Sequence, residues 1–290
     1  MTESLSVSIP AYQAEKYIAQ AVASVRAQNW PGQVQILVID DGSRDNTAAA
    51  AQALGVQVLR KAQGGAASAR NEGLKLATGQ LILLLDADDV LTEGALATMA
   101  DAMAENGTDA VFAMAEDFIS DELTDAQKAE LRPRTAPYSG VLPGCSLIKR
   151  QVFETVGLFD DTMKSGETVA WLLKLRDAGI KSVQLPTVTL KRRLHLTNTG
   201  RTQQKQEMAN YAALLRKRMM KKPCIRWFLW FPLFITPCPG WKASWTVWFS
   251  TPGGHWRAFW WRTALQMLPG NVCCAAAASW RTRVLPCGWC

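Results

Sequence analysis

The last 83 residues of this 290-residue chain lack acidic residues entirely: no Asp or Glu follows Glu207, although eleven Lys and Arg do. The other 21 Lys and Arg and all 25 Asp and Glu lie in residues 1–207, which therefore carry a net charge of −4. Ten of the twelve Trp and six of the seven Cys lie beyond Pro223. This break in composition predicts one folded domain of about 200 residues, followed by an atypical basic, Trp- and Cys-rich tail.

Cysteine is nearly absent from the first 220 residues, where Cys145 stands alone. A disulfide framework is thereby excluded for this part of the chain, and a reducing compartment such as the cytoplasm is expected. The first ten residues have neither the basic region nor the long apolar region of a secretory signal. We therefore expect none there.

The tail lacks a long apolar run. Ile225–Ile235 is rich in apolar residues but contains Arg226 and Pro232, and it is far shorter than the ~20 residues of a spanning helix. We expect a basic helix over 201–222 and then a tail over 223–290 that is either associated with a membrane surface or disordered and non-native. No nucleic-acid-binding motif accompanies its positive charge, so nucleic acid is not expected as a partner. The expected location is the cytoplasm, peripheral to the inner face of the membrane if the tail binds lipid.

Strand and helix patterns alternate over residues 1–113, with short connections. Such alternation predicts an α/β fold, a mostly parallel sheet covered by helices on both faces. The runs that predict strands are Leu5–Ile9, Val34–Ile39, Val56–Arg60, Leu81–Leu85 and Asp109–Ala113. Helices are predicted near 18–30, 66–77 and 95–106, where apolar residues recur at helical spacing or Gly follows the last turn.

Residues 114–200 have a less regular pattern. The segment 117–137 is acidic and polar and contains prolines, so a solvated helix and loop are expected there, as an insertion rather than core. Further predicted elements are helices at 151–156 and 167–178 and a short pair of strands at 182–185 and 188–190, on either side of Pro186. The second of these helices is expected to have Val169, Leu172, Leu173 and Leu175 on or near its buried side.

A cluster of three carboxylates follows the fourth predicted strand, because Leu81–Leu85 runs directly into Asp86–Asp89. Hard cations prefer oxygen ligands, and Mg²⁺ in proteins is usually held by one or two carboxylates together with substrate phosphates. The sequence therefore predicts a site for Mn²⁺ or Mg²⁺ at this strand end. Ligands of open parallel sheets bind beyond the carboxyl ends of the strands. Pro10–Tyr12 and Asp40–Thr47, which follow the first and second strands, are expected beside this site.

Gln63–Gly73 is a Gly-rich entry to a helix that carries Arg70 one turn in. Its backbone N–H groups and the guanidinium could bind a diphosphate. It lacks the GK[ST] of a P-loop, and no GxGxxG follows the first strand, which excludes the two common phosphate-binding loops. Taken singly, such segments also suit ordinary turns and helix caps, as the composition of Asp40–Thr47 illustrates.

Taken together, the segments resemble the family 2 glycosyltransferases of GT-A fold in both order and spacing. The matching stretches are Ser6–Tyr12, Val38–Thr47, Ala69–Gly73 and Ala77–Asp89, and the resemblance continues through Val156–Asp160 to about residue 200. It implies that residues 1–113 bind a nucleotide sugar and that residues 114–200 face the acceptor. The implied activity is metal-assisted transfer of a sugar from a nucleotide-diphosphate donor, UDP-linked in our prediction, to an acceptor hydroxyl in one inverting displacement.

The resemblance also implies a role for each matching residue. Pro10, Ala11 and Tyr12 would line the nucleobase pocket, Asp40 would accept a hydrogen bond from the base, Arg70 would hold base or phosphate, Asp86 would bind the ribose hydroxyls, and Asp88 would ligate the metal. The metal would neutralise charge that builds on the departing nucleoside diphosphate.

The base that deprotonates the acceptor is, in that family, an Asp or Glu at the start of a late helix, usually within a Glu-Asp pair. Here Thr168 stands where Asp is common, which leaves Glu167 as the candidate base. The alternative is that Glu167 only complements the dipole of its helix. His195, within Lys191–Asn198, resembles an Arg-x-His element that closes on the diphosphate or metal, and the arginines before it suit phosphates. The alternative there is a solvated basic strand.

Two other functions fit part of the sequence. Leu83–Leu91 also fits the nucleophile motif of haloacid-dehalogenase-type phosphatases, in which the first Asp is phosphorylated. That motif normally lies on the first strand, whereas here it follows the fourth. A non-catalytic nucleotide-sugar-binding module is favoured by Thr168 at the position of the base. The acceptor is not encoded in these motifs, because such enzymes differ in loops like 117–145.

Overall fold

The computed structural model describes residues 3–139, 143–163, 165–196 and 198, together with 243–250, 256–263 and 281–282. Contacts divide the chain into two units, Met1–Arg226 and Trp227–Cys290. The helix predicted over 201–222 lies outside the described residues. So does most of the tail predicted over 223–290.

The described part of the first unit is built on one mixed, mostly parallel sheet. Its strand order is β3 (Gln57–Arg60), β2 (Val34–Asp40), β1 (Leu5–Ala11), β4 (Leu81–Leu84), β8 (Ser146–Lys149), β6 (Ala110–Ile119), β9 (Ser182–Leu194) and β5 (Val90–Leu91), with β7 (Tyr138–Ser139) paired to β6. The first four strands are parallel, β8 is antiparallel to both neighbours, and β6 and β9 are parallel to each other. The parallel α/β half therefore agrees with the alternating pattern of the sequence.

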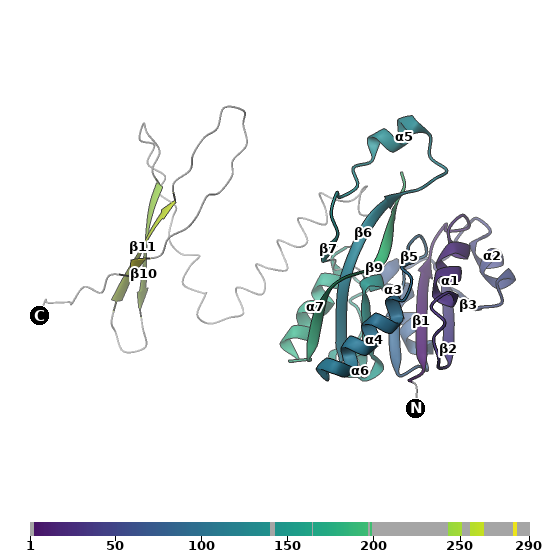
Figure 1. Ribbon diagram of the computed structural model, residues 1–290, viewed down its shortest axis with the longest axis horizontal. Helices are drawn as coiled ribbons and strands as arrows, with labels where there is room; N and C mark the ends of the chain where they lie inside the picture. The colour runs from purple at the N-terminus through teal and green to yellow at the C-terminus, as the bar shows by residue number, and fades with distance from the viewer. Residues whose placement is uncertain are drawn as a thin grey trace, which may run out of the picture. The chain divides into compact units, whose positions relative to one another are not determined.

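Helices cover both faces of this sheet (Figure 1). One face packs against α1 (Ile18–Arg26), α2 (Thr47–Ala53) and α4 (Ala95–Asn106), and the other against α3 (Ala66–Leu76), α6 (Arg150–Val156) and α7 (Glu167–Asp177). The strands are apolar at successive positions because both of their faces are covered. In β4, Leu81 and Leu83 belong to the first core layer, and Ile82 and Leu84 belong to the second.

The structure corrects the prediction for residues 117–137. β6 continues to Ile119, so the first part of this segment belongs to the sheet. Only the remainder forms an excursion, with the short α5 (Asp125–Glu130) beyond the end of β6 (Figure 1). Thr124 and Gln127 form a capping box at its start, which explains how so short and polar a helix begins at this residue.

The pair of short strands predicted around Pro186 is also wrong, because β9 runs unbroken through this residue. The register between β6 and β9 shifts where Phe112 faces Gln184 and Met114 faces Val188. Pro186 therefore lies in a bulge, where its missing N–H costs no ladder hydrogen bond. In α7 the buried residues are Trp171 and Leu175, while Val169, Leu172 and Leu173, which were predicted on or near its buried side, are partly buried.

In the second unit the described residues form three antiparallel strands, in the order β10 (Ala243–Ser250), β11 (Trp256–Thr263) and β12 (Arg281–Thr282). Throughout the described residues of both units, we find no helix that is long and apolar enough to cross a membrane.

Candidate nucleotide and metal site

The carboxyl ends of β1, β2 and β3 bring their last residues into one row. Ala11 is the register partner of Asp40, and Asp40 is that of Arg60. Pro10 and Ala11 end β1, and Tyr12 follows with 43% of its surface exposed. This edge therefore presents an exposed aromatic ring beside a buried carboxylate.

Two consecutive carboxylates at the end of β2 have different surroundings. Asp40 is fully buried; its Oδ1 accepts a hydrogen bond from the N–H of Ser43 (3.0 Å), and its Oδ2 lies 3.2 Å from Nε of Arg60. Asp41 instead accepts bonds from the N–H groups of Gly64 and Gly65 at 2.9 and 2.7 Å. Asp41 was not predicted as a site residue. Its two hydrogen bonds nevertheless fix the Gly-rich entry to α3, which was predicted as part of the site.

Arg70 joins the two halves of the domain. Its Nη2 lies 2.9 Å from Oδ1 of Asp86, and its Nη1 lies 2.8 Å from Oε1 of Glu167, which is 97 positions away in the sequence. Only 5% of Arg70 is exposed. Burial alone would lower the pKa of Arg70, but the two carboxylates raise it above its ordinary value. The guanidinium thus remains a fixed positive charge between two acids.

Glu167 is the first residue of α7, and the preceding Gly166 adopts φ +84°, a left-handed conformation that glycine tolerates. No side chain caps this helix start. The Glu167 carboxylate lies near the positive end of the helix dipole and pairs with Arg70. The structure thus brings the candidate base and Arg70 together, and Thr168 adds a hydroxyl 3.4 Å from the same Glu167 oxygen.

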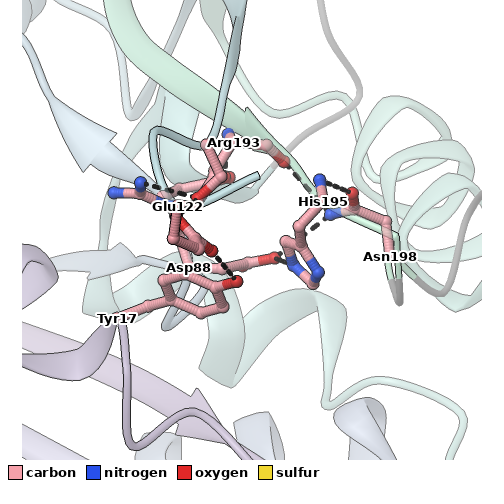
Figure 2. A network of polar contacts seen from close by, with 8 residues as sticks. Tyr17, Asp88, Glu122, Arg193, His195 and Asn198 are labelled. Carbon is pink, nitrogen blue, oxygen red and sulfur yellow. Dashed lines mark hydrogen bonds and ion pairs between the residues drawn. The ribbon is translucent and has the colours of Figure 1, made fainter. Parts of the chain in front are cut away.

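Asp88 and His195 form the second pair of the site (Figure 2). His195 Nε2 lies 3.0 Å from Oδ2 of Asp88, and Nδ2 of Asn198 lies 3.3 Å from the same oxygen. His195 directly follows the end of β9, and Asp88 lies in the loop between β4 and β5, so 107 positions of sequence separate them. Both were predicted site residues, and the structure brings them together.

Asp89, the third acid of the cluster, faces inward. It is 4% exposed, and its Oδ1 accepts a hydrogen bond from the N–H of Arg193 at 3.0 Å. Burial, followed by the charges of Asp88 and Asp86, raises the pKa of Asp89 well above its ordinary value. Burial and the same acidic cluster also raise the pKa of the Cys145 thiol to about 12, so this thiol is not a nucleophile near neutral pH.

A metal ion fits the Asp88 and His195 pair by donor chemistry. A carboxylate oxygen and an imidazole nitrogen are both accepted ligands of Mn²⁺. Adjacent ligands of an octahedral ion bound at ~2.1 Å lie about 3 Å apart, and the Asp88 and His195 atoms are separated by 3.0 Å. Within the described residues, no three His, Cys, Asp or Glu side chains gather as a complete metal cage. The two residues therefore suit an ion whose remaining ligands are phosphates or water.

Sequence reasoning missed the residues that hold this pair. Arg193 was grouped with possible phosphate ligands, but its Nε donates to the carbonyl of Asp88 (2.9 Å) and its Nη1 to the hydroxyl of Ser120 (3.3 Å). Its third guanidinium nitrogen donates to the side-chain oxygen of Gln20, so all three bind protein acceptors rather than a phosphate. The hydroxyl of Tyr17 donates to Glu122 (2.6 Å). Every one of these contacts crosses between distant segments, so no local pattern could indicate them.

One hollow lies apart from these groups. It has a volume of about 310 Å³ beside the C-terminal half of α7. Its lining is Phe112, Ser139, Leu172, Leu175, Arg176, Ile180, Ser182 and Gln184. None of the predicted site residues contributes to it.

Comparison with known proteins places this geometry in a family. The sequence model described as Glycosyl transferase family 2 matches residues 6–157, just over half of the chain. Glycosyltransferase GlyG of Streptococcus pneumoniae is 27% identical over 183 residues, which cover 54% of this chain and 60% of that protein. The chain thus spans about 60% of that relative's length.

Solved structures show the same fold at low sequence identity. A Staphylococcus aureus TarS fragment (1–349) in complex with UDP has a TM-score of 0.58 at 19% identity, covering 76% of this chain and 66% of that one; the same fragment has been solved with UDP-GlcNAc. Mannosyltransferase PcManGT of Pyrobaculum calidifontis, in complex with GDP-Man and Mn²⁺, has a TM-score of 0.56 at 17% identity, covering 74% and 65%.

Proposed function

The chain belongs to glycosyl transferase family 2, and we propose that it moves a sugar from a nucleotide-diphosphate donor to an acceptor hydroxyl. The observation that carries this proposal is the convergence of two charged groupings at the carboxyl edge of the sheet. Arg70 lies between Asp86 and Glu167, and Asp88 lies against His195. Such a site offers groups for a ribose, a diphosphate with its cation, and an acceptor proton.

The proposed donor is a UDP-sugar. TarS of S. aureus, which shares the fold, binds UDP and UDP-GlcNAc. In this chain Pro10, Ala11 and Tyr12 supply one wall of the base pocket, with the exposed Tyr12 ring available for stacking on a base. Asp40 is the proposed hydrogen-bond acceptor for the base, and a base bound there would compete with Arg60, whose Nε lies 3.2 Å from Oδ2 of Asp40. Asp86, partly exposed, is the proposed contact of the ribose hydroxyls.

Asp88 and His195 are the proposed holders of Mn²⁺ or Mg²⁺. The cation, when bound, offsets the charge of the leaving nucleoside diphosphate. Asn198 donates to the Asp88 oxygen that faces His195, and this bond fixes the rotamer of the carboxylate. Arg70 is the second proposed contact for base or phosphate, because its charge is permanent and its partners Asp86 and Glu167 border the same edge.

Glu167 is the proposed general base, with inversion of configuration as the expected outcome of a single displacement. Glu167 pairs with Arg70. A donor phosphate that binds Arg70 would therefore weaken this ion pair and leave the Glu167 carboxylate able to accept the proton of the acceptor hydroxyl. The rival role is structural, in which Glu167 only holds Arg70 in place. The two roles differ in what the isosteric Glu167→Gln does, because the amide still accepts a hydrogen bond from Arg70 but cannot accept a proton.

The test is UDP-sugar hydrolysis or transfer in the presence of Mn²⁺, comparing the natural chain with Asp88→Asn and Glu167→Gln. We expect each variant to lose about 100-fold or more in turnover. UDP affinity in the absence of metal should stay within about two-fold for Glu167→Gln if Glu167 is the base. Asp101→Asn, an exposed change on α4, is the matched control and should behave as the natural chain.

Three results would redirect the proposal. Full turnover in Asp88→Asn would contradict the assignment of Asp88 as a metal ligand. A natural chain that binds UDP but never turns over with any acceptor or with water is a nucleotide-sugar-binding module, as Thr168 at the expected Asp position would allow. Release of inorganic phosphate from simple phosphomonoesters would favour phosphatase chemistry at Asp86.

A further inference from the structure

Arg193, at the end of β9, lies where four segments of the chain meet (Figure 2). Its guanidinium donates from Nε to the carbonyl of Asp88 at 2.9 Å, from Nη1 to the hydroxyl of Ser120 at 3.3 Å, and from Nη2 to the side-chain oxygen of Gln20. All three nitrogens thus bind protein groups in three different segments. A buried guanidinium with this geometry fixes its partners in space, because the fork is planar and rigid.

The backbone of the same residue continues the set of contacts. Its N–H donates to Oδ1 of Asp89 at 3.0 Å, and its carbonyl accepts from Nδ2 of Asn198 at 3.1 Å. The Asn198 side chain also accepts a hydrogen bond from the N–H of His195. Arg193 therefore forms hydrogen bonds with the Asp88–Asp89 loop on one side and with the turn that carries His195 on the other.

Aromatic rings complete the enclosure. The guanidinium lies 5.0 Å from the ring of Tyr17 and 4.6 Å from that of Phe118, distances typical of cation–π contacts. The ring of Tyr17 in turn packs 5.0 Å from the ring of His195. The hydroxyl of Tyr17 donates to Glu122 in the segment after β6. The His195 ring is thus supported from its face as well as through its backbone.

We propose that Arg193 is a positioning residue that sets the spacing between Asp88 and His195 for cation binding, rather than a ligand of the donor. The inference rests on the proposed function, in which these two side chains hold the cation. Arg193 touches neither a Glu167 nor an Arg70 atom in the described contacts, so its loss should spare the rest of the site. Partners that orient metal ligands typically change metal affinity by 10–100-fold when they are altered.

The test uses the full chain with Arg193→Lys, which keeps the charge but cannot span the three acceptors. Two quantities are measured: the dissociation constant of Mn²⁺ with UDP present, from the EPR signal of the free ion, and that of UDP in EDTA, from calorimetry. We expect the Mn²⁺ constant to rise about 10-fold or more and the UDP constant to change less than about two-fold. Arg26→Lys is the matched control, since Arg26 also donates to a carbonyl, that of Leu54, but at the last turn of α1. Both constants should stay unchanged there.

A second variant covers the possibility that Arg193→Lys does not fold, as judged by circular dichroism. Asn198→Ala removes the other tie between the two sides and should raise the Mn²⁺ constant in the same way. A folded variant of either kind with an unaltered Mn²⁺ constant overturns the inference. An unaltered Mn²⁺ constant in Asp88→Asn has a different meaning. It would show that Asp88 does not hold the cation, and so would contradict the proposed function itself. A rise in the UDP constant in EDTA would make Arg193 a donor ligand and would also overturn the inference.

Discussion

Replacing Asn71 should destabilise the domain more than its size suggests. Its side-chain amide forms a closed pair of hydrogen bonds with one backbone residue: Nδ2 donates to the carbonyl of Phe159 at 3.0 Å, and Oδ1 accepts from the N–H of Phe159 at 2.9 Å. Both residues are buried, with 6% and 5% of their surfaces exposed. The pair ties α3 to the segment between α6 and α7. Asn71→Ala therefore leaves a buried N–H and a buried carbonyl without partners.

The magnitude follows from those two groups. An orphaned buried polar group costs about 1–3 kcal/mol, so two of them cost about 2–6 kcal/mol. The better helix propensity of Ala returns about 0.5 kcal/mol in α3. We expect Asn71→Ala to lower the free energy of unfolding by about 3 kcal/mol. Asn106→Ala, an exposed change that removes one bond from the last turn of α4, should lower it by less than about 0.5 kcal/mol.

Asn71→Asp sharpens the test through its pH dependence. The carboxylate can still accept from the N–H of Phe159, but it then faces the carbonyl of Phe159, and burial raises its pKa above the ordinary ~3.9. A raised folded-state pKa means that the stabilising proton is bound at low pH and lost as pH rises. The loss of unfolding free energy in Asn71→Asp, relative to the natural chain, should therefore be smaller at pH 5 than at pH 7. Urea unfolding followed by circular dichroism measures both. A loss below about 1 kcal/mol for Asn71→Ala, or a pH-independent difference for Asn71→Asp, would refute the reasoning.

Three further outcomes are expected. Gly73→Ala should destabilise the domain by about 1–3 kcal/mol in urea unfolding despite the better helix propensity of Ala, because its Cβ would lie 1.8 Å from Oγ of Ser8; an unchanged midpoint would contradict the packing. A double-mutant cycle of Arg70→Met and Glu167→Ala, each of which removes the contact, should give a coupling energy of at least about 1 kcal/mol, and additive effects would deny that the pair at 2.8 Å contributes to stability. Tyr17→Phe should reduce, but not abolish, the tyrosine ionisation near pH 12 in difference absorbance at 295 nm, since burial and a carboxylate partner raise the pKa of both Tyr17 and Tyr138 to about 12. The stability that Tyr17 contributes is complete below pH 10 and lost as pH rises through 12, so the natural chain should lose more stability over this range than Tyr17→Phe does, and equal losses would contradict the assignment.

Elements with a local cause were the ones that the sequence could predict. α4 has the predicted bounds of 95–106 because Gly107 adopts φ +58° just after the last turn. β4 could be predicted from its apolar run, because successive residues of this strand pack into the core layers on opposite faces of the sheet. The Gly-rich entry to α3 was also visible, although Asp41, which holds it, was not, because its bonds reach Gly64 and Gly65 from another strand end.

What sequence reasoning could not supply is pairing across the fold. β9 was divided at Pro186 because a proline usually ends a strand, and only the register with β6 shows a bulge that accommodates it. Arg193 looked like one more basic residue of a solvated strand. Its burial depends on Tyr17, Phe118 and Ser120, which come from distant segments. The charge pattern of one segment carries no information about which of its arginines will be enclosed.

Under the proposed function, the bridge from Asp86 through Arg70 to Glu167 would link donor binding to the acceptor side of the reaction. One guanidinium offers a fixed number of N–H groups, so a diphosphate that draws on Arg70 must weaken its bond to at least one carboxylate. Glu167 would then gain freedom to accept a proton only after the donor has arrived, which would limit wasteful hydrolysis. The double-mutant cycle measures this directly when it is repeated with saturating UDP. The coupling between Arg70 and Glu167 should fall in the complex, and a coupling that UDP leaves unchanged would mean that Glu167 stays bound to Arg70 and serves only to hold it.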